Sequence, residues 1–474
     1  MCSWPTLTPL SLPLSLSLVA KMIAGLTATL SVSTAKPNIV WFLTDDQDQM
    51  LGASFPELNG VGPMPQTKAI LQVGGSMATN FFIHTPICCP SRSELLSGRY
   101  LHNIKSTDGS GCMHVNETTV NEATFAKYLQ AGGYTVGMFG KYLNNVPNFV
   151  PPGFDVWMAN GGGDYVHPKF ATKNINFMDP PSKNIPDGTN HDMSKIGNYS
   201  TSVIGNVSLA WIRSVVNKAH TPATTSDSSS STATAAHQPF FAYIAPKAAH
   251  EPFNPAPWYV DHWDPAWPTH EPRPVNWNCS AESRAHHHGA IATAPMIDAP
   301  GAAVITGVFQ NRWRTLMSVD DVIGAVFSEC VKLGVAENTY FFYSSDHGFQ
   351  LGQFNILMDK RQTYDWDTRI HLLARGPGIQ AGSTWAQPAT QVDLAPTFLG
   401  LAGLPKPPLM DGKSLAPLLI DAGRAVESGR NNDVVVSAST KAHLVLLGAN
   451  STAYAAGWRT AGEILIVYFI LSYE

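Results

Sequence analysis

Four short runs of apolar residues recur along the chain, each about as long as a buried strand. They lie at 37–44, 133–140, 239–245 and 339–345. Nearly unbroken apolar runs of this length are typical of parallel strands that are covered on both faces. Segments with helical spacing separate the runs. This alternation predicts an α/β fold with a large, mainly parallel sheet and helices on both of its faces.

Two of the intervening segments have the spacing of amphipathic helices. Residues 121–132 place Phe125 and Leu129 on one face, and residues 312–333 repeat apolar positions at helical spacing before Gly334. A glycine just past the last turn is a common end for a helix. We expect the second helix to be structural.

Changes in composition indicate how the chain is organised. A main domain is predicted over 36–420, with flexible insertions at about 219–238 and 281–303. The first insertion is rich in Ser, Thr and Ala, and the second carries the run His286-His287-His288. A histidine run can bind a metal ion, but we favour a solvated loop. Residues 421–474 are predicted to form a partial C-terminal subdomain with an atypical tail.

The first 35 residues have the features of a secretory signal peptide. They are apolar, lack acidic residues, carry one charge at Lys21 and end in small residues. A membrane anchor is the alternative, but prolines and Lys21 interrupt any span of about 20 apolar residues. Sequons for N-glycosylation also fit secretion, and they lie at Asn116, Asn198, Asn206, Asn278 and Asn450. We expect a protein of the secretory pathway, outside the cell or in its wall, or in a lysosome or vacuole.

Composition narrows the class of protein. A chain of 474 residues with 44% hydrophobic and 14% charged residues suits one large α/β unit with a smaller one appended. The net charge of -5 argues against a nucleic-acid partner, since proteins that bind nucleic acids are usually basic. Six cysteines are too few for a disulfide scaffold. Cys112 and Cys279 lie in loop-like segments where they could be oxidised, and their pairing cannot be deduced.

Chemically capable side chains follow each of the four predicted strands, in the order Asp45 and Asp46, Lys141, His250, and Asp346 with His347. Open α/β sheets place ligand sites at the carboxyl ends of their strands, so we expect one shared site. Taken singly, an aspartate pair more often caps a helix or a turn, and a lone lysine or histidine is more often structural. Adjacent carboxylates are also the hard oxygen ligands that Ca²⁺ or Mg²⁺ requires.

The segment 84–99 carries the densest motif. Pro90 is expected to open a short helix that ends at Gly98, which places Cys88 just outside the helix N-terminus. Backbone N–H groups and the helix dipole favour negative charge there, and Arg92 adds a fixed cation. A nucleophile at this position would meet an anionic substrate. The alternative is that the two adjacent cysteines are structural, either buried or disulfide-bonded.

The pattern Cys-x-Pro-Ser-Arg-x-x-x-Leu-x-Gly-Arg, from Cys88 to Arg99, resembles the signature of the type I sulfatases. The chain looks closest to the N-acetylglucosamine-6-sulfatases and the plant and algal arylsulfatases, through strings at 139–144, 315–321, 359–362 and 375–378. The resemblance implies an alkaline-phosphatase-like sandwich with a small C-terminal sheet, which we expect to be largely truncated in this sequence. It also implies that a formylglycine-generating enzyme oxidises Cys88 to formylglycine during secretion.

Residue roles follow from the same resemblance. It implies that a cation, Ca²⁺ or alternatively Mg²⁺, is held with the residue-88 diol by Asp45, Asp46, Asp346 and His347. The sulfate would be contacted by Lys141, His250 and Lys360, and the formylglycine would be stabilised by Arg92. The sequence departs from the family at position 347, which is often Asn, and at Leu143, two residues after Lys141, where many members have His. The base for the second step is therefore open.

Three functions remain open from the sequence. The first is hydrolysis of an aryl or carbohydrate sulfate ester by a formylglycine nucleophile and a divalent cation. The second is hydrolysis of a phosphodiester or phosphonate ester by the same machinery, since a metal site with lysines tolerates phosphate. The third is binding of sulfated glycans without turnover. We favour the first, and expect no stable membrane span.

Overall fold

The computed structural model describes residues 35–49, 61–178, 185–220 and 238–420. Nearly all of the predicted signal peptide and of the insertion at 219–238 lies outside these residues. Residues 421–474 lie outside them as well, and with them the sequon at Asn450 and the predicted C-terminal subdomain. The description below concerns the domain that begins at Lys36.

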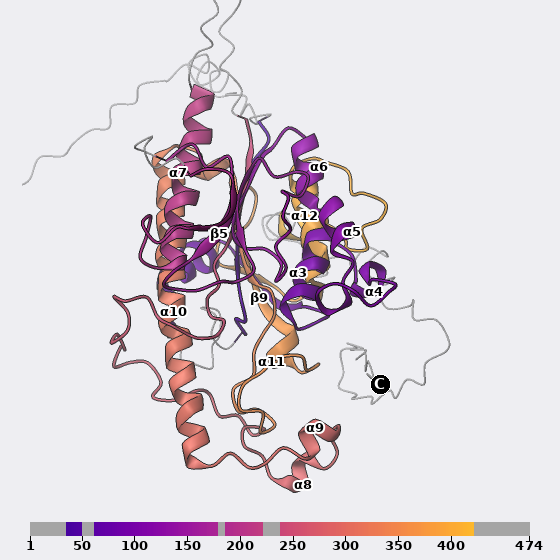
Figure 1. Cartoon of the computed structure of the whole chain (residues 1–474), viewed down its shortest axis with the longest axis vertical. Helices are drawn as coiled ribbons and strands as arrows, with labels where there is room; N and C mark the ends of the chain where they lie inside the picture. The colour runs from indigo at the N-terminus through magenta and orange to yellow at the C-terminus, as the bar shows by residue number, and fades with distance from the viewer. Residues whose placement is uncertain (1–34, 50–60, 179–184, 221–237, 421–474) are drawn as a thin grey trace, which may run out of the picture. The chain divides into compact units, whose positions relative to one another are not determined.

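The described residues form one 11-stranded sheet (Figure 1). Its strands are β1 (Asn38–Thr44), β2 (Ser76–Phe82), β3 (Thr135–Lys141), β4 (Val156–Asn160), β5 (Lys169–Lys173), β6 (Gly188–Asp192), β7 (Phe240–Ala245), β8 (Thr339–Ser345), β9 (Arg369–Arg375), β10 (Ser383–Trp385) and β11 (Ala389–Thr390). The order is β10-β2-β9-β8-β1-β7-β3-β4-β5-β6, and β11 pairs with β2. All four predicted strands lie side by side, as β8, β1, β7 and β3.

The sheet is parallel at its centre and mixed toward its edges. The pairings from β8 through β1, β7 and β3 to β4 are all parallel, whereas β8–β9, β9–β2, β4–β5 and β5–β6 are antiparallel. The central parallel part confirms the prediction. The antiparallel edges were missed because strands such as β5 and β6 are half-exposed and lack continuous apolar runs.

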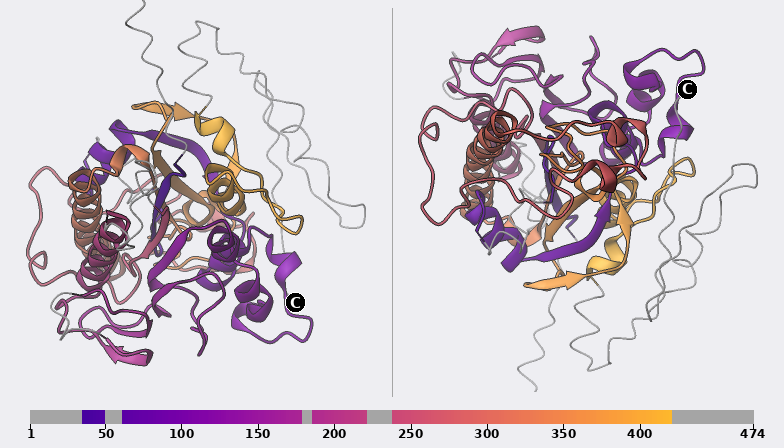
Figure 2. Two further views of the ribbon diagram at one scale, coloured as in Figure 1. Left: turned by 90° about the horizontal axis from the view of Figure 1, so that it is seen from above. Right: turned by 90° about the horizontal axis from the view of Figure 1, so that it is seen from below.

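Helices cover both faces of the sheet, as predicted, because each central strand contributes apolar side chains to two hydrophobic cores, one on each face. In β1, Ile39, Trp41 and Leu43 face one core while Val40 and Phe42 face the other. The first core is closed by α3 (Cys88–Ser97), α6 (Phe125–Ala131) and α12 (Leu394–Leu401), and the second by α7 (Ser200–His220) and α10 (Ala299–Lys332) (Figures 1 and 2). The shorter helical elements are α2 (Pro65–Thr67), η2 (Lys68–Val73), α4 (Leu101–Ile104), η3 (Cys112–His114), α5 (Glu117–Glu122), α8 (Ala281–Arg284), α9 (Gly289–Ala292), η5 (Ala336–Asn338), α11 (Asp365–Thr368) and η6 (Gln391–Asp393).

The helix of the cysteine motif begins earlier than predicted. Cys88 is the first residue of α3 and Pro90 the third, so Cys88 lies inside the first turn and not just outside it. The first N–H groups of a helix have no intrahelical acceptor, and a proline in the first turn therefore costs no hydrogen bond. Gly98 ends the helix in the left-handed conformation, with φ 65, as predicted.

Two other helix predictions need correction. The segment 121–132 is divided between α5 and α6, because Thr124 between them adopts an extended conformation. Helix α10 starts at Ala299, where the Asp298 side chain accepts a hydrogen bond of 2.8 Å from the N–H of Gly301. The segment 281–303, expected to be a loop, therefore holds α8, α9 and the start of α10. None of the helices in the described ranges is both long and apolar enough to cross a bilayer.

Candidate functional site

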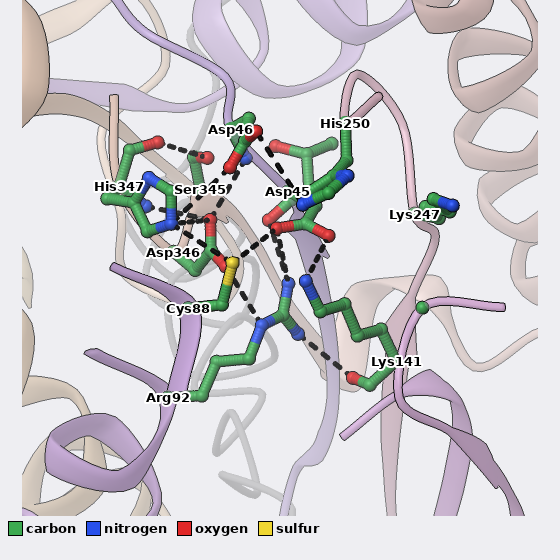
Figure 3. A network of polar contacts seen from close by, with 12 residues as sticks. Asp45, Asp46, Cys88, Arg92, Lys141, Lys247, His250, Ser345, Asp346 and His347 are labelled. Atoms are coloured by element: carbon green, nitrogen blue, oxygen red, sulfur yellow. Dashed lines mark hydrogen bonds and ion pairs between the residues drawn. The ribbon is translucent and has the colours of Figure 1, made fainter. Parts of the chain in front are cut away.

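The side chains predicted to form one site converge at the carboxyl ends of β1, β3, β7 and β8, next to the first turn of α3 (Figure 3). The contacts described below join all of them, namely Asp45, Asp46, Cys88, Arg92, Lys141, His250, Asp346, His347 and Lys360. Sequence position after a buried strand was enough to bring together Asp46 and Asp346, which are 300 positions apart. Lys360, which follows no predicted strand, was placed in the site by the family resemblance alone.

Carboxylates, a thiol and an imidazole form the innermost group. The ligand atoms of Asp45, Asp46, Cys88 and His347 all lie within 4.8 Å of one another, and all four residues are buried. The Sγ of Cys88 lies 3.6 Å from Asp45 Oδ1 and 3.4 Å from His347 Nε2. Asp346, the fifth predicted ligand, lies beside this group, with Oδ1 3.7 Å from His347 Nε2.

The backbone turns two adjacent aspartates toward the same point. Neighbouring side chains in a strand face opposite ways, but Asp46 leaves β1 with a left-handed φ of 58, a conformation that Asp tolerates better than most residues. The N–H of Asp46 donates to Asp346 Oδ1 at 3.1 Å, and the N–H of Gln47 donates to Ser345 Oγ at 2.9 Å. These bonds fix the end of β1 against the end of β8.

The donor set fits a divalent cation. His347 Nδ1 lies 2.9 Å from the carbonyl oxygen of Gly348, so a proton on Nδ1 leaves the Nε2 lone pair facing Asp46 Oδ1, 3.4 Å away. Two aspartate carboxylates and this nitrogen converge on one point, with Asp346 behind them. Carboxylate oxygens are the ligands that Ca²⁺ and Mg²⁺ prefer, and imidazole is the softer member of the set.

Arg92 ties the strand ends to α3. Its guanidinium is fully buried and donates to Asp346 Oδ2 at 2.9 Å and to the carbonyl oxygen of Lys141 at 2.9 Å. It also lies 3.6 Å from Asp45 Oδ1. Burial alone would lower the pKa of Arg92, but Asp346 and Asp45 outweigh it and raise the pKa, which keeps the cation permanently charged.

Two lysines neutralise the remaining charge. Lys141 Nζ lies 2.5 Å from Asp45 Oδ2, and Lys360 Nζ lies 2.7 Å from both oxygens of Asp46. Burial would raise the pKa of Asp45, yet Lys141 and the other cations hold it well below 3.8. Burial and the charge of Asp45 raise the pKa of Asp346. Both lysines thus lie against the two aspartates that follow β1.

Cys88 and His250 have shifted protonation equilibria. Burial disfavours the thiolate of Cys88, but Lys141 and other charges lower its pKa to about 7. His250 Nδ1 lies 2.9 Å from its neighbour's carbonyl oxygen, and Nε2 lies 3.9 Å from Asp46 Oδ2. Burial would lower the pKa of His250, but Asp45 and Asp46 outweigh burial and raise it. The imidazolium form is therefore favoured beside the carboxylates.

Sequence reasoning missed two cations near the site. Lys247 lies two residues past the end of β7, much as Lys141 stands at the end of β3 (Figure 3). Its Nζ donates to the carbonyl oxygen of Gly163 at 2.5 Å. The same position-after-a-strand signal could have found it. Arg312 projects from α10 and is fully buried, donating to the backbone oxygens of Asp46 and Ala249. The predicted role of that helix was structural only, and its helical spacing gives no sign of this contact.

The remaining predicted positions differ in how far their side chains are exposed. Leu143 is fully buried in the core beneath α3 and offers no polar group. Of the predicted glycosylation sites in the described residues, Asn198 and Asn206 are exposed. The side chains of Asn116 and Asn278 are half-buried and hydrogen-bonded, the first capping α5 and the second donating to Ile297 at 2.9 Å. Glycosylation of all these residues remains a prediction.

Comparison with known proteins is unambiguous at the family level. Residues 37–404 match the family model described as Sulfatase. The chain is 33% identical over 421 residues to a protein of Drosophila melanogaster named extracellular sulfatase SULF-1 homolog, covering 86% of this chain and 34% of the relative. It is 32% identical over 404 residues to human N-acetylglucosamine-6-sulfatase, covering 82% and 65% respectively. The chain thus spans about a third to two thirds of these relatives.

The fold is also found among solved structures. One of them is a protein solved in complex with its substrate D-glucosamine-2-N,6-O-disulfate. It aligns with this chain with a TM-score of 0.57 and 22% sequence identity. The match covers 81% of this chain and 80% of that one. At this level of identity the likeness establishes the shared fold, an alkaline-phosphatase-like sheet between helices.

The buried position of Arg92 gives a prediction about stability. Substituting Arg92→Gln leaves Asp45 and Asp346 buried without their guanidinium, and removal of one partner of a buried pair costs about 3–5 kcal/mol. Urea denaturation in metal-free buffer measures the change. The matched control is Lys332→Ala, whose side chain is 73% exposed and 3.9 Å from Glu329, and whose loss should lie within about 1 kcal/mol. Equal effects of the two substitutions would contradict this assignment.

Proposed function

Because the chain belongs to the sulfatase family, we propose that it hydrolyses sulfate esters of aryl or carbohydrate compounds, with formylglycine derived from Cys88 as the nucleophile. The observation that carries the proposal is the placement of the Cys88 sulfur 3.6 Å from Asp45 and 3.4 Å from His347, inside a buried group of carboxylates and cations. A buried thiol has no structural need for such surroundings. The same surroundings suit an oxygen nucleophile that attacks an anionic ester.

A divalent cation is part of the proposal. Asp45, Asp46 and His347 would hold it together with the oxygens of residue 88, and Asp346 would complete the group. Ca²⁺ is our first choice and Mg²⁺ the second, because most of the ligand atoms are hard oxygens. When bound, the cation would offset negative charge on the sulfate and on the nucleophile.

The cationic side chains would bind the sulfate and orient residue 88. Lys141 and Lys360 are each paired with an aspartate in this structure. Once a bound cation neutralises those aspartates, the two ammonium groups would form ion pairs with the sulfate oxygens. Arg92 would hold Asp346 and the end of β3 in place and so keep the first turn of α3 in register. Such preorganised charge is usually the largest contribution to catalysis.

His250 is the proposed general acid. Its Nε2 lies 3.9 Å from Asp46 Oδ2, and the neighbouring aspartates favour its protonated form. One hydroxyl of the hydrated aldehyde would form a bond to sulfur as its proton passes to a neighbouring carboxylate such as Asp45. The bond from sulfur to the leaving oxygen would break as His250 protonates that oxygen. The second hydroxyl would then lose its proton, releasing sulfate and restoring the aldehyde. The buried, apolar Leu143 cannot supply that base, so the group that takes this last proton is left open.

The proposed substrate and location follow the relatives. The human relative is named for N-acetylglucosamine 6-sulfate, and the solved structure holds a sulfated glucosamine. We propose a sulfated sugar or an aryl sulfate as the substrate, and passage through the secretory pathway, where a formylglycine-generating enzyme would act on Cys88. The fly relative is named as extracellular, which supports this route. The proposed destinations are the space outside the cell, the cell wall, and the lysosome or vacuole.

The direct test uses the secreted protein. The peptide containing residue 88 should be about 18 Da lighter than the cysteine form, because an aldehyde oxygen replaces the sulfur and two hydrogens. The protein should release sulfate from p-nitrophenyl sulfate faster than it cleaves a p-nitrophenyl phosphate diester. Cys88→Ala should abolish turnover, while the control Cys330→Ala, on the other face of the sheet, should retain it.

Each contrary result has a meaning. A preference for the phosphate diester would indicate that the chain hydrolyses phosphodiesters or phosphonate esters. Binding of sulfated glycans by aldehyde-bearing protein without turnover would indicate a binding protein. An unmodified thiol in correctly processed, active material would contradict the proposed nucleophile.

The role of His250 makes a prediction about leaving groups. His250→Gln should lower kcat/KM for an alkyl sugar sulfate by about 10²–10⁴-fold, whereas p-nitrophenyl sulfate, whose leaving group needs no proton, should lose little. Because the pKa of His250 is raised above 6.5, the wild-type kcat/KM for the sugar sulfate should fall only as the pH rises through that higher value. The fall should vanish in His250→Gln. The exposed His286→Gln is the control. Equal losses for both substrates would rule out proton donation by His250.

A further inference from the structure

A second group of sulfur and carboxylate atoms lies outside the catalytic site. The ligand atoms of Cys89, Cys112 and Glu117 are within 4.8 Å of one another, and Cys89 Sγ is 3.8 Å from Glu117 Oε1. Cys89 is fully buried and Cys112 is half-buried, and both contact the core beneath α3. Two thiols this close in a protein that passes through an oxidising compartment are candidates for a covalent bond.

We propose that Cys89 and Cys112 form a disulfide in the mature protein. The proposal rests on the secretory location proposed above, because cytosolic thiols are kept reduced. Cys89 is the second residue of α3 and Cys112 the first of η3, and the side chain of Cys88 points instead to Asp45 and His347. The bond would therefore link the helix that carries the nucleophile to the turn beside it.

The other described cysteines are poorly placed as partners. Cys330 is buried in the core on the opposite face of the sheet from Cys89. Cys279 is not part of either sulfur-containing group in the described ranges. Cys112 is thus the described cysteine whose sulfur is positioned to react with that of Cys89.

The turn that carries Cys112 has a conformation that needs support. Gly111, Met113 and His114 all have left-handed backbones, with φ of 82, 54 and 62, and two of them are not glycine. Such residues persist where the surroundings over-determine them. Backbone bonds of 2.8 Å from Ser106 to His114 and from Asn116 to Ile104 close the loop on itself. A bond from Cys112 to Cys89 would anchor the turn to α3.

The oxidation can proceed by exchange with a disulfide of a secretory-pathway oxidoreductase. The thiolate of Cys112 attacks a carrier sulfur, and the carrier leaves as a thiolate from the mixed disulfide when Cys89 attacks the Cys112 sulfur. Two thiol protons are released, and the two electrons reduce the carrier to a dithiol. A hydrogen bond from Cys89 lowers the pKa of Cys112, which favours Cys112 as the attacking group.

The bond would also separate the fates of two adjacent cysteines. Cys88 must remain a thiol until its oxidation to the aldehyde, while Cys89 would be held by Cys112. The pairing leaves Cys88 as the reactive thiol of the motif, and it fixes the first turn of α3, on which the direction of the residue-88 side chain depends.

Peptide mapping of the secreted full-length protein tests the proposal. Free thiols are blocked with N-ethylmaleimide, and the protein is digested without reduction. The peptides containing residues 89 and 112 should appear joined, about 2 Da below the sum of their masses because two hydrogens are lost, and fragmentation should locate the bond at 89 and not at 88. Dithiothreitol should separate them. Maleimide on both residues, or a bond to another cysteine, would overturn the proposal.

A stability measurement separates the disulfide from a metal site. Dithiothreitol should lower the Tm of the wild type to that of Cys112→Ser and leave the variant unchanged, whereas Cys279→Ser should respond like the wild type. Zinc bound to wild type and lost from Cys112→Ser would overturn the proposal in favour of metal ligation. Mapping needs no enzymatic activity, so a joined pair beside an unmodified Cys88 would refute the proposed nucleophile and leave the disulfide standing.

Discussion

The cost of burying three carboxylates at one edge of a sheet governs this structure. Asp45, Asp46 and Asp346 are removed from water, and an isolated ion in such a position would be expelled or neutralised. Arg92, Lys141 and Lys360 provide the compensating charge. In the proposed function, a divalent cation held by the same carboxylates would release the compensating side chains to bind an anionic substrate. Folding and the proposed chemistry thus depend on the same ion pairs.

Helix α3 links residue 88, the proposed nucleophile, to that edge. Ser91 donates a hydrogen bond to the backbone oxygen of Asp346, and Arg92 donates to the ends of β1 and β3. The polar residues of the motif therefore hold the first turn of α3 against three strands, and residue 88 is placed by bonds made by its neighbours. This division of roles explains why the motif extends beyond the cysteine.

Much of this arrangement could be predicted from the sequence because two local patterns, an apolar run and the polar residue that follows it, indicate where a strand ends and which side chain stands there. A buried parallel strand is visible as an apolar run, and a side chain directly after it belongs to the shared edge, as for Asp45 and Lys141. Features set by contacts between distant segments are not visible in this way. Arg312 enters the site from a helix whose spacing indicates only packing, and the left-handed turn at Asp46 depends on Asp346. The start of α10 at Ala299 was missed although its capping residue, Asp298, was visible in the sequence.

A crystal structure of the secreted protein with Ca²⁺ would test the central claim most directly. We predict a single cation bonded to oxygens of Asp45 and Asp46, to His347 or Asp346, and to two oxygens on a hydrated aldehyde at residue 88. A cation bound elsewhere, or a residue-88 side chain directed away from these aspartates, would contradict the account.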